Sequence, residues 1–401
     1  MSAPLWTADA RRLVAARAVR AFADGLASVL LPAYLTALGL SAVEIGFVVA
    51  ATLLGSAALT LGLGLRAHRG KPRTLLLAAC ALMVGTGIAF AHVEALLPLL
   101  AIAFVGTLNP SAGDVSVFLP IEQSLLASEV GAAERARLYA RSNVAAAAAG
   151  ALGALASAFP EPLARAAGTT LLDAMRVAFY VYAAAGFAAA FLYAGLRPAA
   201  SSGEPRQAPL ARSRGIVLRL AALFTLDSFG GGFVVQSLLA LWLFERFGFS
   251  LADAAGFFFV ASLLAGASQL LSPVLARRFG LIETMVFTHL PANALLVLAA
   301  FMPSATAAVA CLLARMALSQ MDVPARQAFV MAVVPPEERA AAASVTNVPR
   351  SLGGGVAPLI AGWLLSASTF GWPLVLGGTL KIAYDLLLLH RFRSHEESRP
   401  R

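Results

Sequence analysis

The sequence predicts an all-α polytopic membrane protein built from two pseudo-symmetric bundles of six helices. Three observations support this fold class: a lack of charge, recurring apolar stretches, and motifs that repeat between the two halves. Of the 401 residues, 59% are hydrophobic and 13% are charged, whereas soluble domains carry roughly 25% charged residues. Because so few charges cannot cover a surface that faces water, we expect most of the surface to face lipid.

Apolar stretches of about 20 residues, long enough to cross a bilayer as a helix, leave room for about twelve spans. The predicted helices cover residues 12–38, 41–65, 74–92, 96–126, 137–159, 171–196, 215–244, 251–275, 283–302, 304–333, 339–368 and 371–390. Ser41 and Ser250 precede two of these helices, where a hydroxyl can cap free backbone N–H groups. Cys80 and Cys311 lie inside apolar spans, so we expect no disulfide, metal site or cofactor.

Basic residues are concentrated in the loops on one side of the predicted spans. One loop on that side holds Arg66, Lys71 and Arg73, whereas the opposite side holds little beyond Arg165 and Arg246. The positive-inside rule then places both termini in the cytoplasm, and we expect a bacterial inner-membrane location. The net charge of +9 is spread over short loops rather than gathered on one face, which argues against nucleic acid as a partner.

The longest hydrophilic stretch runs from Arg197 to Arg214 and is rich in Ala, Ser, Pro and Arg. This composition is typical of a flexible linker. We therefore expect an N-terminal six-helix bundle over residues 1–196, a cytoplasmic linker over residues 197–214, and a C-terminal bundle with a short cytoplasmic tail over residues 215–401.

The two halves share short motifs at a constant offset. Val130–Ala136 aligns with Val334–Ala340, and at the same offset Pro120–Gln123 aligns with Pro324–Gln327. Earlier in each half, Gly39-Leu40-Ser41 matches Gly248-Phe249-Ser250, and Asp24 matches Asp227. Parallel repeats of this kind build transporters from two bundles, with the substrate site between them near the middle of the membrane.

With this architecture the chain resembles the major facilitator superfamily over nearly its whole length. The family's cytoplasmic motif, Gly-x-x-x-Asp-x-x-Gly-Arg-Arg, is only partly kept. Gly70, Lys71 and Arg73 are present, but Leu63 and Ala67 stand where Gly and Asp belong. The resemblance implies a transporter of two six-helix bundles whose central site opens to one side of the membrane and then to the other.

A second family feature, the proline–glycine signature of antiporters, has a similar pattern in the eleventh predicted helix, from Gly354 to Gly362. It is not clear in the fifth helix, where the family carries it. The antiporter subclass therefore stays open at this point.

Ionisable residues inside a span cost about 2.5–3.5 kcal/mol each on insertion scales, so each suggests a function. In the tenth predicted helix, Arg315, Ser319, Asp322 and Arg326 fall on one narrow stripe. We expect this stripe to face a polar cavity, with Asp322 and Arg326 able to pair. The alternative is a structural ion pair that locks the helix to a neighbour.

The first helix carries Arg20 and Asp24 one turn apart, and Asp227 is the counterpart of Asp24 in the seventh helix, before three glycines. A carboxylate that drives transport must gain and lose a proton as the cavity changes sides. Asp24 beside Arg20 fits that role, and a purely structural pair is the alternative.

The fourth and tenth helices line the central cavity in the family that the chain resembles. Glu122 there aligns with Arg326, which suggests a bridge between the two halves. In the twelfth helix, Lys381 and Asp385 are expected to form a structural i, i+4 pair at the periphery. The proton-coupling candidates are Asp24, Glu122, Asp227 and Asp322. The substrate-cavity candidates are Arg20, Gln123, Arg315, Ser319, Arg326, Gln327, Asn347 and Arg350.

The leading interpretation is a secondary active transporter that moves a small solute by alternating access, and we expect it to be a monomer in the bilayer. The sequence has no nucleotide-binding motif, so the energy must come from an ion or substrate gradient. Within the family that the chain resembles, proton-coupled efflux of a small organic compound is the first choice. Uptake or export of an anionic metabolite is the alternative, because the buried arginines can neutralise carboxylate or phosphate. A membrane-embedded enzyme or scaffold is a different class, which would need a nucleophile with a base such as a buried histidine cluster; none is expected.

Overall fold

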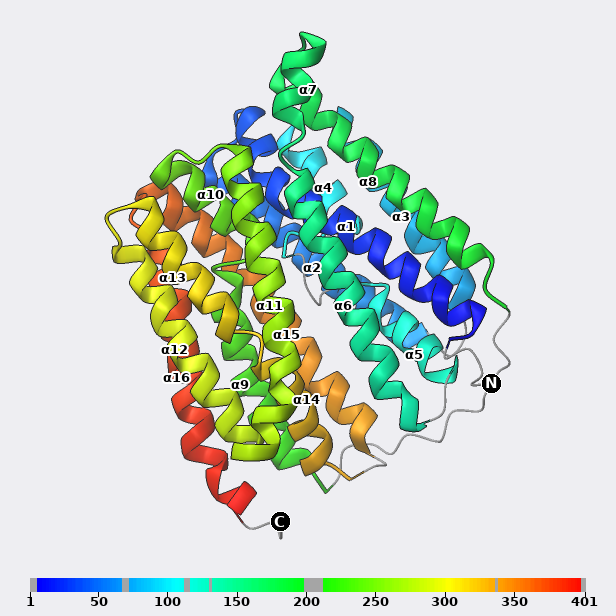
Figure 1. Cartoon of the computed structure of the whole chain (residues 1–401), viewed down its shortest axis with the longest axis vertical. Coiled ribbons are helices and arrows are strands. Elements are labelled where there is room, and N and C mark those ends of the chain that lie inside the picture. The colour runs from blue at the N-terminus through cyan, green and yellow to red at the C-terminus, as the bar shows by residue number, and fades with distance from the viewer. Residues whose placement is uncertain are drawn as a thin grey trace.

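The computed structural model describes residues 6–66, 72–111, 116–129, 132–197, 212–335 and 338–397. Within these ranges the chain is helical, with no strand. Figure 1 shows two groups of helices that meet at one end of the molecule and diverge at the other. We call the diverging end, where α1 begins and α16 ends, the terminal end; the end where α1 stops and α2 starts is the far end.

The first half contains α1 (Ala8–Ala37), α2 (Ala42–Arg66), α3 (Pro72–His92), α4 (Leu96–Val105), α5 (Leu119–Glu129), α6 (Ala132–Ala156), α7 (Pro160–Ala167) and α8 (Leu171–Ala194). The second half contains α9 (Arg214–Gly232), α10 (Gln236–Phe247), α11 (Leu251–Phe279), α12 (Leu281–Phe301), α13 (Ala305–Leu318), α14 (Asp322–Val333), α15 (Arg339–Ala367) and α16 (Trp372–Glu397). The predicted linker at 197–214 lies mostly outside the described residues, so the domain boundaries stay a prediction.

By length and composition alone, nine described segments are apolar enough to cross a membrane. The remaining spans of a twelve-span arrangement are α1, the α4–α5 pair and α15. The helix α1 is rich in charged residues, and α4 is too short to cross a membrane alone. The all-α, two-bundle fold class predicted from composition and repeat is thus confirmed.

Three helices that the sequence predicts as continuous are each broken in two. The predicted helix 96–126 becomes α4 and α5, and its break contains Pro110. Proline has no N–H and its ring clashes with the carbonyl four residues back, here that of Gly106, which caps α4. The side chain of Asn109 stabilises the turn by accepting hydrogen bonds from the backbone and hydroxyl of Ser111.

The predicted helix 304–333 breaks for a related reason. Pro324 is incompatible with helical geometry at Gln320, so α13 ends at Leu318 and α14 restarts at Asp322, which places the proline in a first turn. The predicted helix 215–244 breaks after Gly232.

The glycines before this last break permit close packing of backbones. A Cβ on Gly232 would lie 2.3 Å from the carbonyl oxygen of Gly354, and one on Gly230 would lie 2.9 Å from Cγ of Lys381. Any side chain here would push α9 away from α15 and α16, so the glycines set the distances between these helices.

The matching turns of the two halves confirm part of the repeat. Gly39 and Gly248 both adopt positive φ, at 85° and 65°, so each ends a helix in the left-handed conformation. Two residues later, Ser41 and Ser250 each exchange hydrogen bonds with an acidic residue in the first turn of the next helix. Both serines thus cap their helices as predicted.

The two halves are joined at the far end. Ser237, at the start of α10, donates its hydroxyl to the backbone oxygens of Ser28 at 2.7 Å and Pro110 at 3.1 Å. The carbonyl released by the α4–α5 break therefore finds a donor in the other half, as a buried backbone group must. Gly46 of α2 and Gly362 of α15 also bring their backbones together, since a Cβ on Gly362 would lie 2.6 Å from the oxygen of Ala42.

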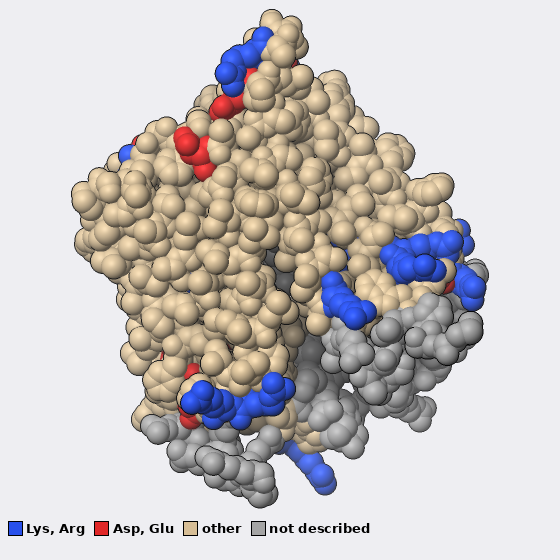
Figure 2. Space-filling view, in the orientation of Figure 1, with Lys and Arg blue, Asp and Glu red and all other residues tan. Residues whose placement is uncertain are grey.

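The hydrophobic core has the same asymmetry. One large cluster spans both halves and includes Leu30 of α1, Val48 of α2 and Trp242 of α10. Towards the terminal end the halves have separate clusters, one around Tyr193 and another around Tyr384. Figure 2 shows the molecule hollowed between the halves on this side. Among the described residues, the halves therefore share a core at the far end and have separate cores at the terminal end.

Candidate functional site

The first half contains a buried ion pair between α1 and α5. Arg20 lies 2.6 Å from the carboxylate of Glu122, with Nη2 facing Oε2. Tyr193 of α8 donates its hydroxyl to Glu122 and accepts from Nε of Arg20 at 3.1 Å. Arg20 is 5% exposed and Glu122 is fully buried. The two charges thus cancel in a site from which water is excluded, where an unpaired charge would be costly.

The segment before α5 completes the surroundings of Arg20. Its Nη1 donates to the hydroxyl of Ser116 at 3.3 Å, and its guanidinium lies 3.9 Å from the centre of the Phe118 ring. Arginine in this setting combines an ion pair, hydrogen bonds and a cation–π contact. The break between α4 and α5 makes this possible, because it leaves the segment near Phe118 outside helical geometry.

Asp24 lies one turn after Arg20 but is not paired with it. Asp24 is partly exposed and makes no hydrogen bond or ion pair with any residue that the structure describes. The predicted Arg20–Asp24 pair is wrong because Arg20 is already bound by Glu122 and Tyr193.

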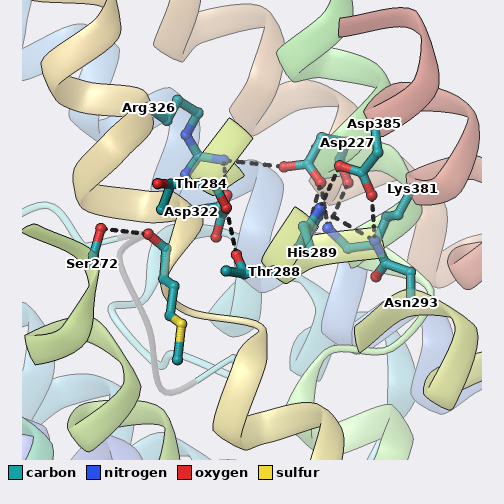
Figure 3. A network of polar contacts seen from close by, with 11 residues as sticks. Asp227, Ser272, Thr284, Thr288, His289, Asn293, Asp322, Arg326, Lys381 and Asp385 are labelled. Atoms are coloured by element: carbon teal, nitrogen blue, oxygen red, sulfur yellow. Dashed lines mark hydrogen bonds and ion pairs between the residues drawn. The ribbon is translucent and has the colours of Figure 1, made fainter. Parts of the chain in front are cut away.

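The second half contains a larger network of polar contacts, shown in Figure 3. Asp227 of α9 is its centre. Its carboxylate binds Nζ of Lys381 from α16, and its Oδ2 lies 3.2 Å from Nη1 of Arg326 on α14. The same Arg326 nitrogen lies 3.2 Å from Asp322, one turn earlier on α14. Nε2 of His289 on α12 lies 4.0 Å from Asp227.

The network continues from α12 to α16. Nδ1 of His289 lies 2.9 Å from Oδ1 of Asp385, and the amide of Asn293 donates to the other oxygen of Asp385 at 3.0 Å. His289, Asn293 and Asp385 are all buried. Together with Asp227, Asp322, Arg326 and Lys381 they form what we call the C-terminal network.

The two halves place opposite charges on corresponding helices, although Arg20 and Asp227 do not stand at aligned positions. In the first half the base is on the first helix, as Arg20, and the acid is on the fourth span, as Glu122. In the second half the acid is on the first span, as Asp227, and the base is on the fourth, as Arg326. Each arginine also lies against a phenylalanine ring; for Arg326 it is Phe224, at 5.6 Å.

The predicted bridge between Glu122 and Arg326 is not formed. Each residue finds its partner within its own half: Glu122 binds Arg20, and Arg326 binds Asp227 and Asp322. The i, i+4 pairing of Asp322 with Arg326 is as predicted. Sequence alignment of the halves identified opposite charges correctly, but it could not show that each charge has its partner within its own half.

The predicted pair between Lys381 and Asp385 is also wrong. Lys381 reaches Asp227, and Asp385 binds His289 and Asn293 instead. The last helix is therefore part of the polar centre rather than its periphery. Gly230 and Gly231 on α9 could have signalled this, because they leave room for the Lys381 side chain.

Histidine was not expected to take part in a buried cluster, and that expectation is wrong for His289. Its spacing of four residues from Asn293 placed both on one helical face. Each is polar within an apolar span, which is a signal that sequence reasoning missed.

The predicted stripe of the tenth span is interrupted by the α13–α14 break. Ser319 caps the end of α13 and is buried, whereas Asp322 begins α14. Arg315, on the last turn of α13, contacts the sulfur of Met316 at 3.2 Å and makes no ion pair among the described side chains. Its buried Nε has no hydrogen-bond partner.

Most of the other predicted cavity residues are exposed. Gln123 and Gln327 each follow a buried charged residue and are exposed, as is Asn347. Arg350 is partly buried on α15. In the part of the chain that the structure describes, no group of three or more His, Cys, Asp or Glu side chains is arranged to hold a metal ion.

A family model described as the Major Facilitator Superfamily matches residues 13–358. The chain belongs to the major facilitator superfamily. Among curated proteins, this superfamily member is similar to the uncharacterized membrane protein YJR124C of Saccharomyces cerevisiae, with 24% identity over 96% of this chain and 94% of that protein.

Solved structures share the fold at low sequence identity. A variant of the nucleoside transporter NupG matches 96% of this chain and all of its own, with a TM-score of 0.74 and 12% identity. A bacterial homologue of the human lysosomal transporter Spinster, in an inward-facing and unoccupied conformation, matches both chains over their full length, with a TM-score of 0.71 and 15% identity. Membership of the superfamily makes this protein a membrane transporter rather than an enzyme.

Proposed function

We propose that this transporter moves a small organic compound out of the cytoplasm in exchange for protons, by alternating access. The carrying observation is the asymmetry of the two ends: the halves share a core and hydrogen bonds at the far end but are separate at the terminal end. A site between two such halves is reached from one side at a time. Both halves belong to one chain, so a monomer contains the whole site.

The orientation rests on charge. On the face shown in Figure 2, Lys and Arg gather mainly around the terminal end, and acidic residues appear near the far end. Under the positive-inside rule the terminal end, and with it the open hollow, faces the cytoplasm. The structure then corresponds to a state that exchanges solute with the cytoplasm.

Asp24 is the proposed carboxylate that substrate and proton occupy in turn. Glu122, Asp227 and Asp322 are each bound to a cation, whereas Asp24 is partly exposed and unpaired among the described residues. It lies 13 residues before the end of α1 at Ala37, which is about 20 Å from the far end. This depth is close to the middle of a bilayer.

The second candidate is transport of an anionic metabolite, and Arg315 favours it. This guanidinium has no carboxylate partner among the described residues and lies 10 residues after the start of α13 at Ala305, about 15 Å from the far end. A carboxylate or phosphate would complete its hydrogen bonds. Asp24 and Arg315 thus offer opposite charges at similar depth.

Flux in proteoliposomes tests the proposal. Purified transporter is reconstituted, a pH gradient is imposed, and uptake of labelled organic amines, dicarboxylates and phosphate esters is compared. We expect amine-bearing compounds to accumulate in vesicles with an acidic interior, and a protonophore to abolish the accumulation. Accumulation of anionic solutes alone would favour the second candidate. Equal uptake with and without the pH gradient would show that protons do not drive transport.

A further inference from the structure

The C-terminal network has an unequal number of fixed charges. It holds three carboxylates, Asp227, Asp322 and Asp385, against two permanent cations, Arg326 and Lys381. None of the five is more than 7% exposed. A net negative charge in so buried a site is strongly unfavourable, so the network needs either a further positive charge or a proton on one of its carboxylates.

His289 is placed to supply that charge. Its Nδ1 faces Asp385 at 2.9 Å and its Nε2 faces Asp227 at 4.0 Å, so both ring nitrogens point at carboxylates. Only the imidazolium carries a proton on both nitrogens. Histidine is also the side chain whose charge changes most readily near neutral pH.

The surroundings contain one other cation that can balance the network. The middle of α11 carries no charged residue between Asp253 and Arg277, and α16 adds the Tyr384 ring, 6.2 Å from that of His289. From α13 comes Arg315, whose charge interacts with those of Asp227 and Asp322 although it forms no ion pair with them. The α13–α14 break lies between Arg315 and the network.

We propose that His289 and Asp385 form a second proton-binding site, distinct from Asp24, and that Arg315 replaces the proton when it leaves. The proton departs from the imidazolium and leaves neutral histidine. The remaining negative charge then attracts the Arg315 guanidinium towards Asp227 and Asp322, which moves α13 relative to α14. Proton release is thereby linked to the shape of the tenth span. The link to solute movement rests on the proposed function, but the proton site itself does not.

Nitrogen NMR of histidine in lipid nanodiscs tests the proton site directly. The chain has five histidines, and a variant in which His68, His92, His390 and His395 are replaced by glutamine leaves His289 as the only signal. We expect the signal of a ring protonated on both nitrogens, and its replacement by the neutral-ring signal when the pH of the sample is raised. Replacement of Asp385 by asparagine should remove the doubly protonated signal under the same conditions. A neutral His289 ring at every pH tested would overturn the proposal.

Transport and conformation test the link. His289→Gln should lose accumulation driven by a pH gradient and keep exchange of labelled for unlabelled solute. The matched control is His92→Gln, since His92 is exposed and bonded to Tyr180 outside the network. Arg315→Gln should keep the imidazolium signal but abolish the pH-dependent change in distance between spin labels on α13 and α14. Gradient-driven accumulation by His289→Gln at the level of wild type would refute the link while leaving solute flux itself established.

Discussion

The two halves of this transporter solve the same problem, a buried charge in a membrane, to different extents. The first half neutralises Arg20 with Glu122 and leaves Asp24 one turn away without a partner among the described residues. The second half surrounds Asp227, the counterpart of Asp24, with Lys381, Arg326 and His289. The repeat therefore kept an acid at Asp24 and Asp227 but not its partners, and it reversed the sign between Glu122 and Arg326.

This difference has a mechanical meaning. Since each buried ion pair is completed within one half, the halves can separate and approach without stranding a charge in a low-dielectric interior. A bridge from Glu122 to Arg326 would have tied the halves together at mid-membrane. The hydrogen bonds that cross between the halves come from the Ser237 hydroxyl to backbone oxygens and from the Leu251 N–H to the Glu161 carboxylate. Apolar packing also crosses between the halves, along α2 with α15 and α6 with α11.

The largest expected effect belongs to the second half. Arg326→Ala removes the partner of two buried carboxylates, so we expect a loss of about 3–5 kcal/mol in the free energy of unfolding. Denaturant titration in mixed micelles measures it, with Arg278→Ala, at the exposed end of α11, as the control.

A second substitution tests whether Arg326 pairs with Glu122 across the halves or with Asp227 and Asp322 within its own half. Because Glu122 binds Arg20 rather than Arg326, adding Glu122→Gln should not restore the stability of Arg326→Ala. Restoration by that double variant would mean that the halves share a charge pair after all, and the contrast between them would fail.

The corresponding change in the first half should be smaller. Arg20→Ala strands one carboxylate, that of Glu122, which keeps the hydroxyl of Tyr193 as a donor, so we expect a loss of about 3 kcal/mol. Replacing both partners, Arg20→Met with Glu122→Leu, should recover most of it. The same titration measures both variants, and a double variant no more stable than Arg20→Ala would show that the pair has a role beyond neutralising charge.

The contact between the halves at the far end should respond more weakly. In Gly362→Ala the new Cβ would lie 2.6 Å from the oxygen of Ala42, and such overpacking costs about 1–3 kcal/mol in this state. We therefore expect the population to shift towards opening of the far end, measured by spin-label distances between α2 and α15. Gly256→Ala is the control, because a Cβ there meets nothing within 4 Å. An unchanged distance distribution would show that this glycine contact does not hold the far end closed.

The smallest effect on stability should come from Asp24→Asn, within about 0.5 kcal/mol, because no partner is lost. Asp227→Asn should be markedly less stable, since it loosens Lys381, Arg326 and His289. Yet Asp24→Asn should abolish gradient-driven transport while sparing exchange, which flux in proteoliposomes measures. Normal accumulation by Asp24→Asn would exclude it as the residue that substrate and proton share.

Which charges matter was visible in the sequence, but which charges meet was not. The stripe on the tenth span correctly singled out Asp322 and Arg326, because helical periodicity places residues four apart on one face. The sequence analysis missed His289, paired Lys381 with Asp385 instead of Asp227, and assigned Glu122 to the wrong arginine. A polar residue in an apolar span is easy to see in the sequence, and burying it in a membrane costs free energy, so it suggests a function. Its partner on another helix depends on how both helices are rotated and how deeply each lies in the membrane.

The sequence by itself determined that this chain is a bundle of membrane helices in two related halves, since composition, loop charge and cap residues act locally or add along the chain. It also set where helices end, as Gly39 with Ser41 and Gly248 with Ser250 show. The tertiary structure alone decided the pairing of buried charges. Glycine contacts such as Gly232 with Gly354 fix how closely helices pack. The breaks at Pro110 and before Pro324 change the direction of the helices that follow them. Ion pairs form only after those distances and directions are set, which is why they cannot be derived from spacing along one helix.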